Sequence, residues 1–256
     1  MPKSSPSAHH QNVRAVTRAC DILRSFHDTT LQTLAEVSQS TGLDKGTTRR
    51  LLLTLMHSGL IVQNPETQRY GLGRQLRTLA ANVVDDFALL SVAIPVLSEI
   101  ATELHVTSFL SVYHQGTALA LERLHDVKGI EVRWWPIGGT MPLNCGAAPK
   151  LLLAYQSDEE IARVLKKPLQ AATSETIVTR DAFRRRLNLI RRRGWEFAMD
   201  DFVLGLTAVA VPVFDSRGKL ACALSVAGLT PQMSDSRRPR HVHRLLKAAA
   251  IVQERL

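Results

Sequence analysis

The apolar positions from residue 12 to residue 57 follow the spacing of three short helices. A first face predicts a helix over residues 12–26 and consists of Val13, Val16, Ala19, Cys20, Leu23 and Phe26. A second run from Leu31 ends at Thr41-Gly42, which predicts a turn. Asp44 then supplies an N-cap, because its carboxylate can accept from the free amides of the next turn, so a helix begins at about Lys45. The pattern predicts a helix-turn-helix.

The helix that begins at Lys45 has an apolar and a polar face. Its inward stripe is Thr48, Leu51, Leu52 and Leu55. The outward positions are Lys45, Thr47, Arg49, Arg50 and Thr54. Arg and Lys pair with guanine edges or phosphates, and Thr hydroxyls bind phosphates or bases, from a helix that fits the major groove. The alternative is a basic helix face that is merely solvated.

Two strand-like runs favour the first interpretation. Residues 60–63 and 68–72 flank the turn cluster at 64–67, so a hairpin follows the basic helix. A hairpin in this place is a wing, and Arg69 near its tip is placed to reach a phosphate or the minor groove. Three helices and a wing make a winged helix-turn-helix domain.

These segments, in this order, resemble the DNA-binding half of the IclR family of bacterial transcriptional regulators. The resemblance is carried by Val13–Leu23, Thr33–Val37, Thr41–Leu43, Arg50–Leu52 and Tyr70–Gly73. The chain departs from the family at Gly46 and Arg49, which bears on the operator sequence. The DNA-binding residues expected are Lys45, Gly46, Thr47, Thr48, Arg49, Arg50, Thr54 and Arg69.

The remaining pattern predicts an α+β domain with an antiparallel sheet, because strands lie before and after a helical middle. A linker helix over 74–87 and an apolar helix to residue 104 come first. The strands expected are 106–113, 117–124, 130–135, 195–199, 207–214 and 219–227. The helices expected are 146–155, 158–165, 179–193, capped by Thr179 and closed by Gly194, and 238–255.

This half resembles the IclR effector-binding domain, which has a GAF-like fold. The matching segments are Gly139–Leu143, Lys150–Ala154, Arg193–Trp195, Val209–Asp215 and Ala223–Gly228. The resemblance implies a small-molecule pocket between the sheet and the loop and helix after Pro142. The organisation expected is an arm over 1–11, a winged helix-turn-helix over 12–73, a linker helix over 74–87 and the effector-binding domain over 88–256.

The expected pocket suits a small carboxylate. Backbone amides where the loop at 144–148 becomes a helix can face an anion, and the resemblance places Ser225 in the opposite wall. Arg133 would bind a carboxylate if it faced inward and would be a solvated edge residue if it faced outward. An aromatic or small aliphatic acid is the ligand expected. The residues expected to line the pocket are Ile130, Arg133, Met141, Asn144, Cys145, Gly146, Ala147, Ala148, Leu206, Ala208, Ser225 and Ala227.

Net charge favours a polyanionic partner. The 256 residues carry a formal charge of +9. Residues 1–75 hold nine Lys and Arg against five Asp and Glu, a net of +4, which leaves +5 for the rest. Arginine runs at 184–186, 191–193 and 237–240 lie outside the DNA-binding half. Solvated helix faces or oligomer contacts are favoured for these runs over direct DNA contact.

The remaining features limit the chemistry. The three cysteines have no metal-ligand spacing, so no metal or cofactor is expected. No apolar run approaches the ~20 residues that span a bilayer, and residues 1–11 lack the apolar core of a signal peptide. We therefore expect a cytoplasmic protein, not an enzyme, whose partners are a palindromic double-stranded DNA operator, a small-molecule effector and further copies of itself, as a homodimer or a dimer of dimers, with no membrane.

Two alternatives stay open. Cys145 stands at a predicted helix start, where the helix dipole favours a thiolate, so a catalytic domain with a cysteine nucleophile is conceivable. A winged-helix module that binds protein and not DNA is the other, and it predicts no salt-dependent DNA affinity.

Overall fold

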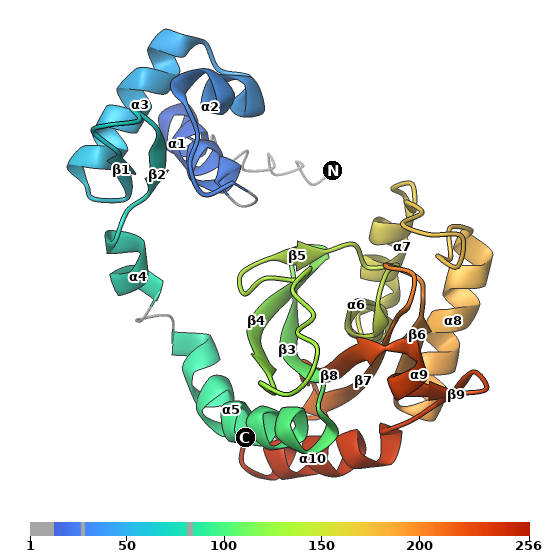
Figure 1. Ribbon diagram of the computed structural model, residues 1–256. Coiled ribbons are helices and arrows are strands. Elements are labelled where there is room, and N and C mark those ends of the chain that lie inside the picture. The colour runs from blue at the N-terminus through green and yellow to red at the C-terminus, as the bar shows by residue number, and fades with distance from the viewer. Residues whose placement is uncertain (1–12, 27–28, 81–83) are drawn as a thin grey trace, which may run out of the picture. The chain divides into compact units, whose positions relative to one another are not determined.

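The computed structural model describes residues 13–26, 29–80 and 84–256, which fall into two compact units, Met1–Val83 and Val84–Leu256 (Figure 1). Each unit has its own hydrophobic core. The smaller unit contains the predicted helix-turn-helix and wing. Its elements are α1 (Arg14–Ser25), α2 (Leu34–Thr41), α3 (Lys45–His57), β1 (Ile61–Gln63), β2 (Tyr70–Leu72) and α4 (Gln75–Ala80).

Local signals fix both helices of the helix-turn-helix. α2 begins with a capping box, in which Thr33 accepts from the Glu36 amide while the Glu36 carboxylate accepts from the Thr33 amide. α2 ends at Gly42, whose φ of 67° suits glycine. The Asp44 carboxylate caps α3, as the sequence predicts, by accepting from the Thr47 amide at 2.8 Å. The core beneath contains Ile22, Phe26, Val37, Leu52, Leu55, Ile61 and Tyr70.

The larger unit is built on one antiparallel sheet of six strands in the order β5-β4-β3-β8-β7-β6. The strands are β3 (Thr107–His114), β4 (Thr117–His125), β5 (Thr140–Met141), β6 (Glu196–Met199), β7 (Leu206–Phe214) and β8 (Leu220–Leu229). The long helices are α5 (Val84–Leu104), α6 (Ala147–Ala154), α7 (Asp158–Leu165), α8 (Arg180–Arg193) and α10 (Val242–Glu254).

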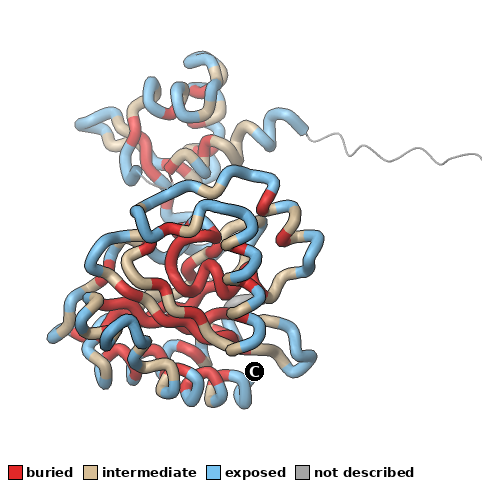
Figure 2. Tube along the Cα trace, turned by 90° about the vertical axis from the view of Figure 1, so that its right-hand side faces the viewer, coloured by how far each residue is buried: buried red, intermediate tan, exposed pale blue. Residues whose placement is uncertain are grey.

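Helices cover both faces of this sheet. α5 and α10 pack on one face, while α6 and α8 lie on the other (Figure 1). Buried residues concentrate along the central strands (Figure 2). The side chains of β8 alternate accordingly: Leu224 and Val226 belong to the core under α5 and α10, whereas Ala223 and Ala227 belong to the core under α6. The α6 face of β8 therefore carries small residues, which leaves space above it.

Three elements of the larger unit differ from the sequence prediction. Residues 130–135 form no strand; the Val132 amide donates to Thr107 Oγ1 at 2.8 Å and Trp135 Nε1 to the Gly139 carbonyl at 2.9 Å, so side chains hold this segment as a loop. The edge strand is β5 instead. The last helix starts only at Val242, because residues 234–239 form a small hairpin of β9 (Ser234–Asp235) and β10 (Arg238–Pro239) after α9 (Thr230–Met233).

Two helix predictions also change. α8 ends at Gly194 in the left-handed conformation, as predicted, but the Thr179 side chain makes no cap hydrogen bond. The expected linker helix spans α4 and the start of α5, and residues 81–83 between them lie outside the described residues.

Helix α5 contains an apolar run that approaches a bilayer-spanning length, contrary to the sequence prediction. Residues Phe87–Leu104 of α5 have a mean hydropathy of 1.7 over 18 residues and, by length and composition alone, could cross a membrane. In the structure this helix packs against β3, β4 and α10.

Candidate DNA-binding surface and ligand pocket

The outward face of α3 presents basic side chains to solvent. Lys45, Arg49, Arg50 and Thr54 are exposed, and Thr47 is half-buried. No ion pair found within residues 13–26, 29–80 and 84–256 engages Lys45, Arg49 or Arg50. Gly46 is exposed between them, so the start of α3 carries no bulky side chain there. The face is free to contact a polyanion.

Two residues expected at the DNA surface have structural roles instead. Thr48 is fully buried, and its hydroxyl donates to the Asp44 carbonyl at 2.9 Å. Arg69 is half-buried, and its Nη1 donates to the Leu31 carbonyl at 3.3 Å and the Glu36 carboxylate at 3.4 Å. Arg69 thus ties the wing to α2. The Thr48 side chain is not available to a partner outside the unit, whereas the Arg69 side chain is 41% exposed.

A narrow pocket opens on the α6 side of the sheet. Its volume is about 250 Å³. The rings of Trp134 and Phe202 lie 4.6 Å apart between their centroids, and both line the pocket. Four residues expected from the sequence also line it, namely Gly146, Leu206, Ala208 and Ala227.

The loop that enters α6 holds free backbone donors. Ala147 and Ala148 are buried in the first turn of α6, and their amides have no acceptor within the described part of the chain. Pro149 has no amide hydrogen to contribute. Ser225 is 4% exposed, and no hydrogen bond of its hydroxyl is found among the same residues. The amides of a helix start favour an anion.

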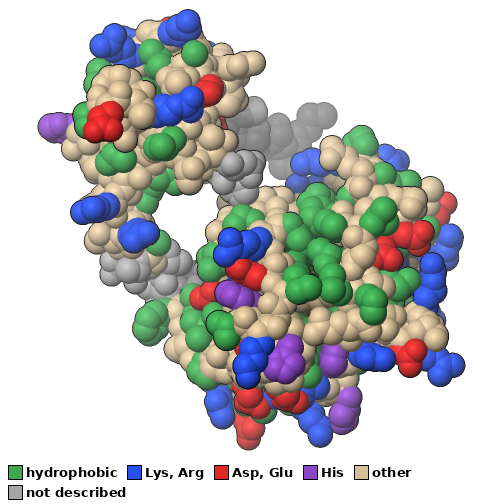
Figure 3. Space-filling view, in the orientation of Figure 1, with side chains coloured by type: hydrophobic (Ala, Val, Ile, Leu, Met, Phe, Trp, Pro, Cys, Tyr) green, Lys and Arg blue, Asp and Glu red, His purple; other side chains and the backbone are tan. Residues whose placement is uncertain are grey.

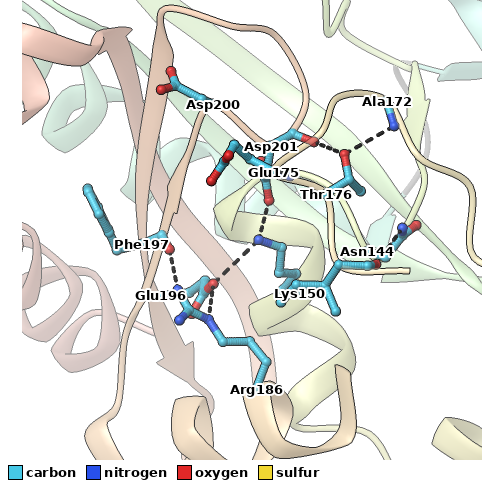
Figure 4. A network of polar contacts seen from close by, with 12 residues as sticks. Asn144, Lys150, Ala172, Glu175, Thr176, Arg186, Glu196, Phe197, Asp200 and Asp201 are labelled. Atoms are coloured by element: carbon cyan, nitrogen blue, oxygen red, sulfur yellow. Dashed lines mark hydrogen bonds and ion pairs between the residues drawn. The ribbon is translucent and has the colours of Figure 1, made fainter. Parts of the chain in front are cut away.

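The neighbouring Gly146 amide is already bound by Asp201. Asp201 Oδ1 accepts from this amide at 3.0 Å, and Asp201 Oδ2 accepts from the Lys150 ammonium (Figure 4). Lys150 also lies 3.5 Å from Glu196 Oε1, and Arg186 Nε donates to the same oxygen at 2.8 Å. The side chains of Lys150 and Glu196 are 3% and 0% exposed. This Lys150 network is paired throughout, as buried charges must be.

The Lys150 network fixes the loop after β6. The Asp201 carbonyl accepts from Thr176 Oγ1 at 2.6 Å (Figure 4). The neighbouring Asp200 carboxylate accepts from the Gly205 amide at 2.9 Å, so Asp200 orients the loop before Gly205. Sequence patterns alone missed Lys150 and Glu196, because a buried ion pair leaves no periodic signal. The loop that carries Phe202 into the pocket is thereby held in place.

Other expected pocket residues lie elsewhere. Ile130 is 53% exposed, and the Arg133 side chain is 77% exposed, with its Nε 2.5 Å from Glu131 Oε2. Arg133 therefore takes the solvated position, not the inward one. Asn144 is buried, and its Nδ2 donates to the carbonyls of Gln170 at 2.9 Å and Ile177 at 3.2 Å. Met141 is also buried, and it packs against Gly146.

Cys145 lacks the properties of a nucleophile. Burial and the negative charge of Asp201 together raise the pKa of the Cys145 thiol to about 11. Such a thiol stays protonated at neutral pH and reacts poorly. No group of three or more His, Cys, Asp or Glu that could hold a metal is found among the described residues.

Comparison with known proteins places both units in one family. The family model "Bacterial transcriptional regulator IclR C-terminal" matches residues 81–254, and the "IclR helix-turn-helix domain" matches residues 15–65. The transcriptional repressor IclR of Escherichia coli is 27% identical over 241 residues, which are 93% of this chain and 88% of the relative. The glycerol operon regulatory protein of Streptomyces griseus is 27% identical over 222 residues, 85% of each chain.

Solved structures agree with these matches. An IclR transcriptional regulator from a Silicibacter species has a TM-score of 0.84 at 25% identity and covers 94% of this chain and 95% of its own. An IclR homolog from Microbacterium hydrocarbonoxydans, solved with 4-hydroxybenzoate, has a TM-score of 0.83 at 24% identity, with 94% and 98% covered. The named relatives are transcriptional regulators and repressors, which are not enzymes. The chain therefore belongs to the IclR family of bacterial transcriptional regulators.

Proposed function

We propose that this regulator binds a palindromic operator as a homodimer or a dimer of dimers in the cytoplasm, and that a small-molecule effector controls its operator affinity. The observation that carries the DNA contact is the outward row of Lys45, Arg49 and Arg50 on α3, which has no acidic partner in the described residues. Two such helices in a dimer would meet half-sites about one helical turn, or a multiple of it, apart.

The effector proposed is an aromatic or small organic acid of a catabolic pathway. Support comes from the buried amides of Ala147 and Ala148 and the unbonded hydroxyl of Ser225, which can donate to a carboxylate. Trp134 and Phe202 offer an aromatic ligand two rings to stack on. A homolog with this fold was solved with 4-hydroxybenzoate, an aromatic acid.

The coupling between the two sites follows from the tightness of the pocket. A ligand that displaces the ring of Phe202 would move a loop that Asp201 and Lys150 hold. We propose that this movement reaches the DNA-binding unit and changes operator affinity by a coupling free energy of about 1–3 kcal/mol, the usual range for allosteric pairs.

The test is to capture sheared genomic DNA of the source organism on the purified protein at moderate salt and to sequence what is retained. A palindrome beside a catabolic operon should be enriched, and Arg50→Ala should lose it, because an exposed arginine without an acidic partner supplies phosphate contacts. Retention that is sensitive to salt but blind to sequence would contradict sequence-specific recognition.

The substrate of the enriched operon is then the effector to test. It should shift the affinity for the captured operator, measured by fluorescence anisotropy. Ser225→Ala should weaken the response without changing operator affinity in the absence of ligand. An equal response in both proteins would contradict a role for Ser225 in effector binding.

A further inference from the structure

Helix α8 carries arginines with two different environments. Its sequence holds seven arginines in 14 residues. Arg186 and Arg193 bind the buried carboxylate of Glu196, and Arg191 donates to the Gln156 carbonyl at 2.8 Å and Asp158 at 3.2 Å. These three have structural partners within the larger unit.

The outer arginines have no such partners. Arg184, Arg185 and Arg192 are exposed, and no ion pair or hydrogen bond of their side chains is found within the described ranges. Asn188 follows Arg184 by four residues and Arg185 by three, and Arg192 follows Asn188 by four, so the four side chains share one face of the helix. We call these four residues the α8 basic face. The single acidic residue within α8 is Asp181, in the first turn.

The α8 basic face borders a surface hollow. The hollow is shallow and open, and it is lined by Arg185, Asn188, Arg191 and Arg192. Lys and Arg side chains lie at the edge of the larger unit where α8 lies, with Asp and Glu side chains among them (Figure 3). Arg180, at the start of α8, lies next to the end of α7, because its Nη2 donates to the Lys166 carbonyl at 3.2 Å.

The chemistry of this face suits phosphate groups. Like charges at neighbouring helix positions repel each other, and a polyanion would relieve that repulsion. Guanidinium groups bind phosphate oxygens in pairs. The residues that line the hollow are three arginines and one asparagine. A helix of 14 residues is about 21 Å long at 1.5 Å per residue, which is enough to follow several phosphates of a duplex.

We infer that the α8 basic face binds the phosphate backbone of double-stranded DNA. Through this face the effector-binding unit would contact DNA directly and add to its affinity for DNA of any sequence. It rests on the proposed DNA binding and is independent of the effector proposal. The face contributes through counterion release, so its effect grows as salt falls.

The test compares two triple variants of the full chain. One is Arg184→Gln/Arg185→Gln/Arg192→Gln, and the matched control is Arg217→Gln/Lys219→Gln/Lys247→Gln, which removes the same charge from exposed residues elsewhere. Anisotropy titrations over a range of salt use random-sequence duplexes of about 20 and about 60 base pairs, roughly two and six helical turns. Arg50→Ala is measured beside them.

The α8 triple should bind the longer duplex at least tenfold more weakly than the control triple does. Its slope of log affinity against log salt should fall by about 0.9 for each phosphate that the face no longer neutralises, and the shorter duplex should be less affected. Both triples should unfold at the wild-type temperature, because the substituted side chains have no described partners.

Equal affinities and slopes for the two triples would overturn the inference. So would a change of oligomeric state in the α8 triple alone, measured by light scattering, because the face would then bind a second copy of the chain. Arg50→Ala separates the two proposals: if it leaves binding intact, DNA recognition by α3 fails, whatever the α8 triple does.

Discussion

The charges on α3 and the charges around Lys150 show two opposite uses of the same chemical groups. On α3, Lys45, Arg49 and Arg50 are exposed and have no acidic partner in the described residues. Around Lys150, every charged group is buried or half-buried and is bound by a group of opposite charge. The first arrangement leaves donors free for a partner, and the second leaves none free.

This difference predicts where a substitution is felt. An exposed charge contributes little to folding, because water solvates it well and salt screens it. A buried charge that loses its partner stays desolvated, so its cost appears in the free energy of unfolding. Substitutions on α3 should therefore change DNA binding without changing stability, and substitutions in the Lys150 network should do the reverse.

Lys150→Met should have the largest effect. It leaves the Asp201 carboxylate buried beside Glu196 without a cation, which costs about 3–5 kcal/mol when one partner of a buried pair is removed. Urea unfolding followed by tryptophan fluorescence measures it, because all three tryptophans, at 134, 135 and 195, lie in the larger unit.

The exposed Lys167→Met is the matched control and should unfold like the wild type. Adding Asp201→Asn to Lys150→Met should restore part of the lost stability, because the uncompensated charge is gone. If Lys150→Met were as stable as Lys167→Met, the distinction between the two regions would not hold.

Lys45→Ala and Arg49→Ala should act on DNA alone. Each should reduce the preference for the captured operator over random DNA by about 1–3 kcal/mol, the usual value of a base contact, whereas Arg50→Ala should weaken both duplexes to a similar extent. Anisotropy titrations give the preference, and the unfolding temperature should stay unchanged. Equal losses on operator and random DNA for Lys45→Ala would contradict this division of roles.

Helix periodicity and cap residues predicted most of the smaller unit. Asp44 caps α3 and Gly42 ends α2, because these signals act within one turn of chain. The same local pattern did not predict that Arg69 pairs with Glu36, 33 residues away. Thr48 was expected both in the inward stripe and at the DNA. Its hydroxyl is buried and bound to the Asp44 carbonyl, so Thr48 belongs to the inward stripe.

The larger unit was harder to predict where contacts are distant in sequence. Residues 130–135 alternate like a strand, yet Thr107 and Gly139 hold them as a loop. The pocket residues on β7 and β8, such as Ala208 and Ala227, follow from strand alternation and the family resemblance. Lys150 finds its partners 46 and 51 residues onward, at Glu196 and Asp201, and no spacing rule reaches that far.

An intermediate case is Glu160, which is paired but partly exposed, and it should give the smallest effect. Arg163 and the Tyr113 hydroxyl donate to its carboxylate and lower its pKa from 4.5 to about 2. Because the folded pKa is depressed, the stabilisation is present above pH 4.5 and is lost as the pH falls toward about 2. Glu160→Gln should flatten the dependence of unfolding free energy on pH in that window.

The exposed Glu254→Gln, at the end of α10, is the control for Glu160→Gln. If the two variants share one pH profile, pairing at a partly exposed site contributes nothing measurable, and only full burial separates structural from functional charge. If the unfolding free energy depends less on pH in Glu160→Gln but not in Glu254→Gln, a partly buried ion pair is enough to stabilise the fold. The half-buried Arg69, paired with Glu36, would then be expected to stabilise the wing and not to contact DNA.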